Sequence, residues 1–174
     1  MFDYVDKPAQ TEYASYYKPY IDLVQSRNLI GSLRETNRQS ISFLKQLPLE
    51  KQDYRYKPGK WCIKEIVAHL IDAERVFAYR ALRFARNDQT ELPGYDHGRY
   101  ICSSKAILRD FYQMLEEFSL LRQSTVALFK SFDADMLSRQ GVANGYIITV
   151  NALGFVIAGH ELHHMNVIKQ RYLD

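Results

Sequence analysis

The sequence predicts an all-α protein, a four-helix bundle. Four stretches of roughly 25 residues repeat apolar side chains at helical spacing, which is the helix length that such a bundle needs. Only 8 Gly and 5 Pro occur in 174 residues, too few for a fold with many turns between strands. No stretch of alternating apolar and polar residues is long enough to form a sheet. We therefore expect residues 1–174 to form a single domain.

The first helix is expected from about Asp22 to Leu47, where Pro48 ends it. Its apolar residues recur three or eight positions apart: Ile30, Leu33, Ile41, Leu44 and Leu47. Residues 48–61 contain a Pro58-Gly59 turn signal and are expected to form a loop.

The second helix is expected from about Cys62 to Arg86. The third is expected to begin behind Ser103 and Ser104 and to end near Phe132. One side of the third helix is apolar: Ile107, Phe111, Leu115, Phe118 and Leu121.

The last helix is expected to start at Thr149, a good N-cap residue, and to run almost to the C-terminus. Residues 133–148 contain Gly141 and Asn144-Gly145 and are expected to form a loop.

Composition excludes several classes of function. The 23 basic and 20 acidic residues give a net charge of +3, too balanced to indicate a nucleic-acid-binding surface. No apolar stretch reaches the roughly 20 residues of a membrane span, and the N-terminus has no signal-peptide pattern. Cys62 and Cys102 form neither a CxxC pair nor a disulfide framework. We therefore expect a soluble cytoplasmic protein that binds neither nucleic acid nor membrane.

Two histidines stand in the apolar stripe of the last helix. At about 100° per residue, His164 lies about 40° from His160, and Leu153, Val156 and Val167 lie close by on the same face. A pair of histidines four residues apart is the commonest helical spacing for metal ligands, whereas hydrogen-bonded core histidines are the plainer alternative. His163 falls at the margin of the stripe.

A third histidine on another helix can complete a metal site. His69 lies beside the apolar face of the second helix, flanked by Glu65 and Asp72. On its own it fits a surface histidine held by two carboxylates. Together with His160 and His164 it becomes the obvious third ligand, whereas His97, in the loop 87–103, is expected to be solvated.

Residues 160–164 also satisfy the zinc-protease pattern H-E-x-x-H. That pattern requires a further ligand downstream, and only ten residues follow His164. In the extended form of the motif, Val167 and Gln170 stand where Gly and His are required. The sequence therefore argues against a protease.

Three segments together resemble proteins of the DinB/YfiT-like family: WCIKEIVAHLIDAER at 61–75, LPGYD at 92–96 and IAGHELHH at 157–164. The resemblance implies a four-helix bundle that holds one divalent transition metal ion, zinc or nickel, through His69, His160 and His164. It also implies an enzyme that acts on a small molecule with a low-molecular-weight thiol such as bacillithiol, mycothiol or glutathione as cosubstrate. Cys62 departs from the family, in which Ser or Thr is usual, without affecting the metal ligands.

Three neutral imidazoles would leave the metal its full charge and an open position. Three functions fit such a site: transfer of a bound thiolate to an electrophile, hydrolysis by a metal-bound hydroxide, or metal binding by a stress-related protein without turnover. No catalytic residue is assigned, and the candidates are Glu161, as a general base or merely as a solvated residue, and Asp72, which could orient His69.

Five arginines are further candidates. Arg75, Arg80, Arg83 and Arg86 on the second helix either attract an anionic thiol cofactor or form a solvated face. Arg122 on the third helix has no role that the sequence defines.

An apolar strip on the last helix indicates a homodimer. Phe155, Ala158, Leu162 and Met165 lie about 140° to 200° from His160, opposite the expected metal ligands. Such a strip must be buried against a second copy or within the chain. The alternative cover is the N-terminal segment 1–21, which is rich in aromatic residues: Phe2, Tyr4, Tyr13, Tyr16, Tyr17 and Tyr20.

Overall fold

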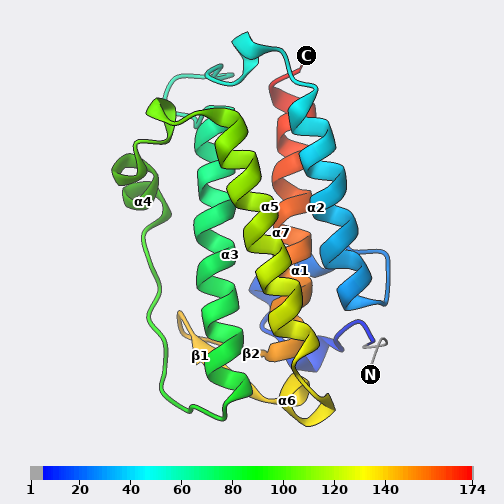
Figure 1. Cartoon of the computed structure of the whole chain (residues 1–174). Coiled ribbons are helices and arrows are strands. Elements are labelled where there is room, and N and C mark those ends of the chain that lie inside the picture. The colour runs from blue at the N-terminus through cyan, green and yellow to red at the C-terminus, as the bar shows by residue number, and fades with distance from the viewer. Residues whose placement is uncertain (1–5, 174) are drawn as a thin grey trace.

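Four long helices lie side by side in the computed structural model, which describes residues 6–173 (Figure 1). They are α2 (Leu29–Lys45), α3 (Ile63–Ala85), α5 (Phe111–Lys130) and α7 (Val150–Arg171). The shorter elements are α1 (Lys18–Ile21), α4 (His97–Ser104), α6 (Ala134–Ser138) and the strands β1 (Gln140–Ala143) and β2 (Tyr146–Thr149). Single 3-10 turns occur at Gln10–Glu12, Ser15–Tyr17, Leu49–Lys51 and Ala106–Leu108. The predicted all-α four-helix bundle is confirmed.

The helices do not alternate in direction along the chain. In Figure 1, α2 and α7 run upward, whereas α3 and α5 both run downward. The contacts form a ring in the order α2, α7, α3, α5, so that α3 packs against α7 and α5. The long connection between α3 and α5, which carries α4 along the outside, makes this parallel pair feasible (Figure 1).

Helix α7 is surrounded by α1, α2 and α3, and its residues 150–161 are all buried. Helix α1 approaches it closely, since a Cβ on Gly159 would lie 2.0 Å from the backbone carbonyl oxygen of Tyr20. The Tyr13 and Tyr17 side chains of this N-terminal segment are buried in the same core cluster as much of α7. Phe2 and Tyr4, expected to share this role, lie outside the described residues.

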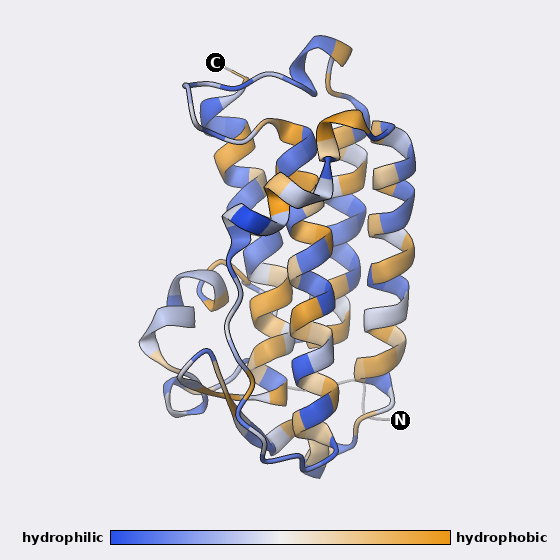
Figure 2. Cartoon of the chain, turned by 90° about the vertical axis from the view of Figure 1, so that its left-hand side faces the viewer, coloured by the Kyte–Doolittle hydropathy of each residue, from blue (hydrophilic) through white to orange (hydrophobic). Residues whose placement is uncertain are grey.

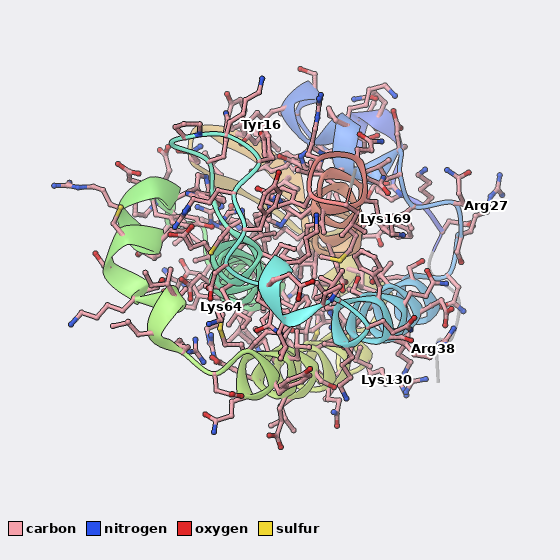
Figure 3. The ribbon with its side chains drawn as sticks, turned by 90° about the horizontal axis from the view of Figure 1, so that it is seen from above. Tyr16, Arg27, Arg38, Lys64, Lys130 and Lys169 are labelled. Carbon is pink, nitrogen blue, oxygen red and sulfur yellow. The ribbon has the colours of Figure 1, made fainter. Side chains whose placement is uncertain are left out.

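The apolar strip of α7 is covered within the chain. Phe155, Ala158 and Met165 are buried and Leu162 is half-buried. The homodimer therefore stays a prediction. The apolar strip of α7 on which it was based is not exposed for contact with a second copy. Seen from above, side chains crowd the space between the long helices, and Arg38 and Lys130 lie at the periphery (Figure 3).

Two predicted helix starts were wrong. The first long helix begins at Leu29, where the Asn28 side chain accepts a hydrogen bond from the N–H of Gly31, and not at Asp22. Ser103 and Ser104 are the last residues of α4 and not the start of the third long helix. Helix α4 ends there because the next residue, Lys105, adopts a left-handed conformation with φ 50°. The cap of α5 is Asp110, whose carboxylate accepts from the N–H of Gln113.

The loop expected at 133–148 contains a short helix and a β-hairpin. Asn144 and Gly145 form its turn with φ of 54° and 76°, the left-handed pair that a two-residue hairpin turn favours. Each strand has four residues, too few to show an alternating pattern. Leu92 pairs with Ala143, so the loop after α3 is anchored to the hairpin.

Thr149 caps α7 as predicted, and its hydroxyl accepts from the N–H of Ala152. Figure 2 shows hydrophobic and hydrophilic residues interleaved along the long helices. Among the described residues, no helix combines the length and the hydrophobicity needed to cross a membrane.

Candidate metal centre

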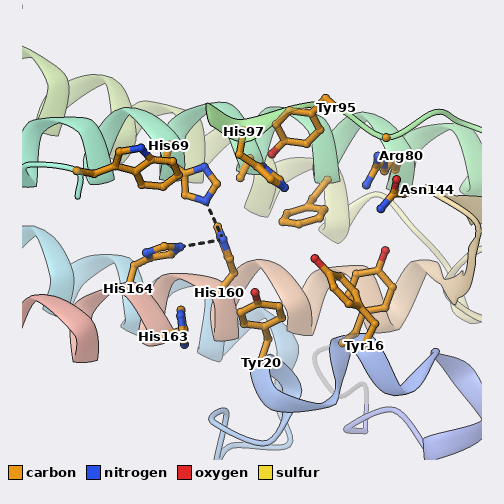
Figure 4. Close-up of a pocket in the computed structure, with 15 residues that line it drawn as sticks. Tyr16, Tyr20, His69, Arg80, Tyr95, His97, Asn144, His160, His163 and His164 are labelled. Carbon is orange, nitrogen blue, oxygen red and sulfur yellow. Dashed lines mark hydrogen bonds between the residues drawn. The ribbon is translucent and has the colours of Figure 1, made fainter. Parts of the chain in front are cut away.

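The three predicted histidines meet between α3 and α7 (Figure 4). The Nε2 atom of His160 lies 3.1 Å from Nε2 of His69 and 3.2 Å from Nε2 of His164. His69 and His160 are buried, and His164 is half-buried. Because α3 and α7 are packed antiparallel neighbours, the lone histidine of α3 faces the pair that stands one turn apart on α7.

The environment keeps these imidazoles neutral. Burial, followed by the proximity of His97, lowers the pKa of His69 to about 4. Burial, followed by the proximity of His69, lowers the pKa of His164 to about 3. The pKa of His160 is also lowered well below its ordinary value, again mainly by burial. At neutral pH each ring therefore has a lone pair free for a ligand bond.

The three nitrogen atoms all lie within 4.8 Å of one another, close enough to share one transition metal ion. Ligand bonds of 2.0–2.1 Å in a tetrahedral arrangement separate neighbouring nitrogen atoms by about 3.4 Å. The two Nε2 distances are within a few tenths of an ångström of this value. The donor set, three neutral imidazoles, suits zinc, copper, iron or nickel.

The other two histidines, His163 and His97, lie beside this cluster. His163 is exposed and its ring meets the edge of the Tyr20 ring, so it does not join the three converging nitrogens. His97 is exposed, but it is not simply solvated as expected. Its ring centroid lies 5.3 Å from that of His69 and 4.4 Å from that of Tyr95. His97 and His69 line one cavity.

The three histidines form one end of a cavity of about 250 Å³. Figure 4 shows Arg80 and Asn144 at the other end, with Tyr16, Tyr20 and Tyr95 along the sides. Trp61, Ala73 and Phe77 complete an aromatic and apolar wall. Nothing in the sequence marks Tyr16, Tyr20, Tyr95 and Asn144 as cavity residues, because they come from three distant segments with no common spacing.

The carboxylates that flank His69 in the sequence contact other residues in the structure. Asp72 lies 4.0 Å from Arg75, and Glu65 pairs with Arg55 and accepts from the backbone N–H at the start of α3. Asp72 does not line the cavity. No contact joins Asp72 to His69 among the described residues, so the orienting role stays a prediction without support. Three positions along the helix from His69, Asp72 lies on a neighbouring face, beside Arg75.

Glu161 is also placed differently from the expectation. It is 1% exposed rather than solvated, and its Oε2 atom lies 2.8 Å from Nη1 of Arg122, away from the cavity. Arg122 also donates to both oxygens of Glu74, at 2.8 and 2.9 Å, and to the hydroxyl of Thr36. This buried network joins all four long helices and gives Arg122 a structural role, whereas Glu161 has no access to a substrate.

Only one of the four candidate arginines, three in α3 and Arg86 directly after it, lines the cavity. Three interact elsewhere: Arg75 with Glu117, Arg83 with Asp88, and Arg86 over the ring of Phe132. Arg80 lines the cavity, is 5% exposed, and donates from Nη2 to the carbonyl oxygen of Pro93 at 2.9 Å.

Comparisons with known proteins agree with this fold. The model of the DinB superfamily matches residues 32–168. Among solved structures, the chain is similar to YfiT from Bacillus subtilis, described as a probable metal-dependent hydrolase with an unusual four-helix bundle topology. The two share 18% sequence identity with a TM-score of 0.68, over 97% of this chain and 94% of that one. No curated protein matches the sequence.

Proposed function

This chain belongs to the DinB superfamily, and on that premise we propose that it is a divalent-metal-dependent enzyme that transfers a low-molecular-weight thiol to an electrophile. The observation that supports this most strongly is the convergence of three Nε2 atoms at the inner end of a cavity. A structural metal site is closed by four protein ligands, whereas three leave a position open for a reactant. Here that position would face the cavity.

A divalent ion held by three neutral imidazoles lowers the pKa of a thiol or a water molecule that binds beside it. The chain supplies the surroundings. Trp61 and Tyr20 place their rings against His69 and His160, with centroids 4.9 and 5.4 Å apart, and so limit the access of bulk water. Among the described residues that line the cavity there is no carboxylate, so no anionic side chain competes with an incoming thiolate.

Hydrolysis is the second candidate, and the description of YfiT favours it. The same open position would then receive water in place of a thiol. The residues around the cavity suit either reactant, so an activity measurement is needed to distinguish thiol transfer from hydrolysis.

The metal site is tested first. Protein purified without a histidine tag should contain about one zinc or nickel ion per chain by elemental analysis. The variants His69→Ala, His160→Ala and His164→Ala should lose it. The matched control is His163→Ala, the adjacent residue on α7 whose ring points elsewhere, and it should keep the metal. Full occupancy in any of the first three variants would contradict the proposed site.

The reaction is tested with metal-loaded protein. Glutathione, bacillithiol, mycothiol and cysteine are each combined with chlorodinitrobenzene, and faster conjugation that is lost in His160→Ala supports thiol transfer. Hydrolysis of nitrophenyl acetate in the absence of any thiol, lost in the same variant, would support the hydrolase. A loaded protein that turns over neither would be a metal-binding protein without turnover.

A further inference from the structure

Arg80 is a buried cation without a counter-ion. Its side chain forms one hydrogen bond, to the carbonyl oxygen of Pro93, and no ion pair with any residue in the part of the chain that the structure describes. A guanidinium has five N–H donors and is rarely buried unless paired. The other two arginines of α3 have ion pairs outside the cavity, Arg75 with Glu117 and Arg83 with Asp88.

A second polar group at the same place also lacks a partner. The hydroxyl of Tyr95 is buried, and it makes no hydrogen bond with the described residues. In Figure 4 Tyr95 lies between His97 and Arg80 along the cavity. Burial raises the pKa of Tyr95 to about 12, so its hydroxyl is a donor at neutral pH. Arg80 therefore keeps N–H donors beyond the one bonded to Pro93, the Tyr95 hydroxyl is unpaired, and both residues line the same cavity.

The amide of Asn144 adds a third polar group to this end of the cavity. Its Oδ1 atom is seated where Gly94 lacks a side chain, 2.0 Å from the position a Cβ would take. The hairpin turn is thus fitted against the segment that carries Tyr95, and both segments close around Arg80.

Helix α3 connects this end of the cavity to the histidines. His69, Ala73, Phe77 and Arg80 follow one another at intervals of four, four and three residues, and so share one face of the helix. Eleven residues separate the backbone positions of His69 and Arg80 by about 16 Å. The intervening Ala73 and Phe77 are apolar, and both line the cavity.

We propose that Arg80 and Tyr95 bind a carboxylate of the substrate, whose reacting end lies at the three histidines and whose middle is apolar. This inference rests on the proposed function and names a substrate class for it. A planar guanidinium matches the two oxygens of a carboxylate, and one cation balances one negative charge. A hydrogen bond from a buried tyrosine hydroxyl adds an uncharged donor to the same group.

Binding of phenylacetate to metal-free protein, measured by calorimetry, tests the carboxylate site apart from the metal. Metal is removed so that the probe cannot bind through it. Phenylacetate should bind at least tenfold more tightly than phenylacetamide, its neutral isostere. Arg80→Met should abolish that preference, and Tyr95→Phe should reduce it. The control Arg83→Met, one turn along α3 and paired with Asp88, should leave it unchanged.

Several results would overturn the proposal: no binding of phenylacetate, equal binding of the two probes, or an unchanged preference in Arg80→Met. Removal of a buried cation without a counter-ion should not lower stability, so Arg80→Met should unfold at the same urea concentration as the unmodified protein or a higher one. Should Arg80→Met fail to fold, Arg80→Lys serves instead, because lysine keeps the charge but lacks the two parallel N–H donors of the guanidinium. This variant should bind phenylacetate about tenfold more weakly. Unaltered affinity in this variant would refute the fork-like contact.

The two proposals fail in distinguishable ways. Absence of metal from the protein purified without a tag would overturn the proposed function and leave the phenylacetate result standing. Loss of the Arg80 effect would leave the metal content untouched.

In loaded protein, mercaptopropionate is compared with mercaptoethanol, and chlorodinitrobenzoate with chlorodinitrobenzene. The pair whose rate ratio collapses in Arg80→Met identifies whether the thiol or the electrophile carries the carboxylate. Rate ratios that Arg80→Met leaves unchanged in both pairs would contradict the proposal.

Discussion

Replacement of Arg122 by Met tests the electrostatic centre of the bundle. Its guanidinium stands between the carboxylates of Glu74 and Glu161, and the three side chains are 3% exposed or less. The cluster thus holds two negative charges and one positive charge. Arg122→Met keeps most of the volume and leaves both carboxylates buried without a cation.

The expected cost is large. Removal of one partner from a buried ion pair destabilises a protein by about 3–5 kcal/mol, and here two carboxylates lose the same partner. A domain of this size has a free energy of unfolding of about 5–15 kcal/mol, so Arg122→Met should lose about a fifth of its stability or more. Glu161→Gln leaves a balanced pair between Arg122 and Glu74 and should cost only about 1 kcal/mol.

The assay is urea unfolding of metal-free protein, followed by far-UV circular dichroism and by the fluorescence of Trp61, the single tryptophan. The triple variant Arg122→Met, Glu74→Gln, Glu161→Gln carries no charge in the cluster and should be more stable than Arg122→Met alone. A cost below about 1 kcal/mol for Arg122→Met would refute the reasoning, since that is the range of an exposed pair. So would a triple variant no more stable than the single one.

Three further predictions follow from the same structure. Gly159→Ala should lower the thermal unfolding midpoint although alanine favours helix, because the added Cβ would displace the backbone of Tyr20, and overpacking of this kind costs about 1–3 kcal/mol; a raised midpoint would contradict the close contact. Metal-free protein should lose stability as the pH falls from 7 to 5, because a folded-state pKa of about 4 for His69 means that the unfolded chain binds the proton first. The loss is about 2 kcal/mol at pH 5 for this residue alone, and an unchanged urea midpoint would contradict it. Burial of the apolar strip of α7 favours a monomer in sedimentation at micromolar concentration, whereas a dimer would show that another surface associates.

The sequence could predict the histidine cluster because its strongest part is local. His160 and His164 stand one turn apart on one helix, and a helix fixes their relative direction without knowledge of the rest of the fold. His69 was the only histidine on another predicted helix. The structure brings these three nitrogens together and leaves His163 apart, as the helical angles predict.

The burial of Glu161, the residue after His160, could not be predicted from helical angles in the same way. A helical wheel separates a buried face from a solvated face, but α7 is surrounded by other elements and has no solvated face over residues 150–161. The partner that makes a buried glutamate tolerable, Arg122, comes from α5. Because no local spacing relates the two residues, the sequence gives no sign of their contact.

The arginine at the far end of the cavity could be predicted in part from the sequence. At about 100° per residue, Arg80 and Arg83 fall about 20° and 40° on either side of His69, whereas Arg75 and Arg86 fall more than about 90° away. The spacing alone therefore reduces four candidate arginines to two. Arg83 is removed by its ion pair with Asp88, a residue of the loop after α3, and Arg80 is left facing Tyr95 from the same connection. A helix can thus direct a cation toward a cavity, but the path of the loop decides which cation finds a counter-ion in the protein and which is left for a ligand.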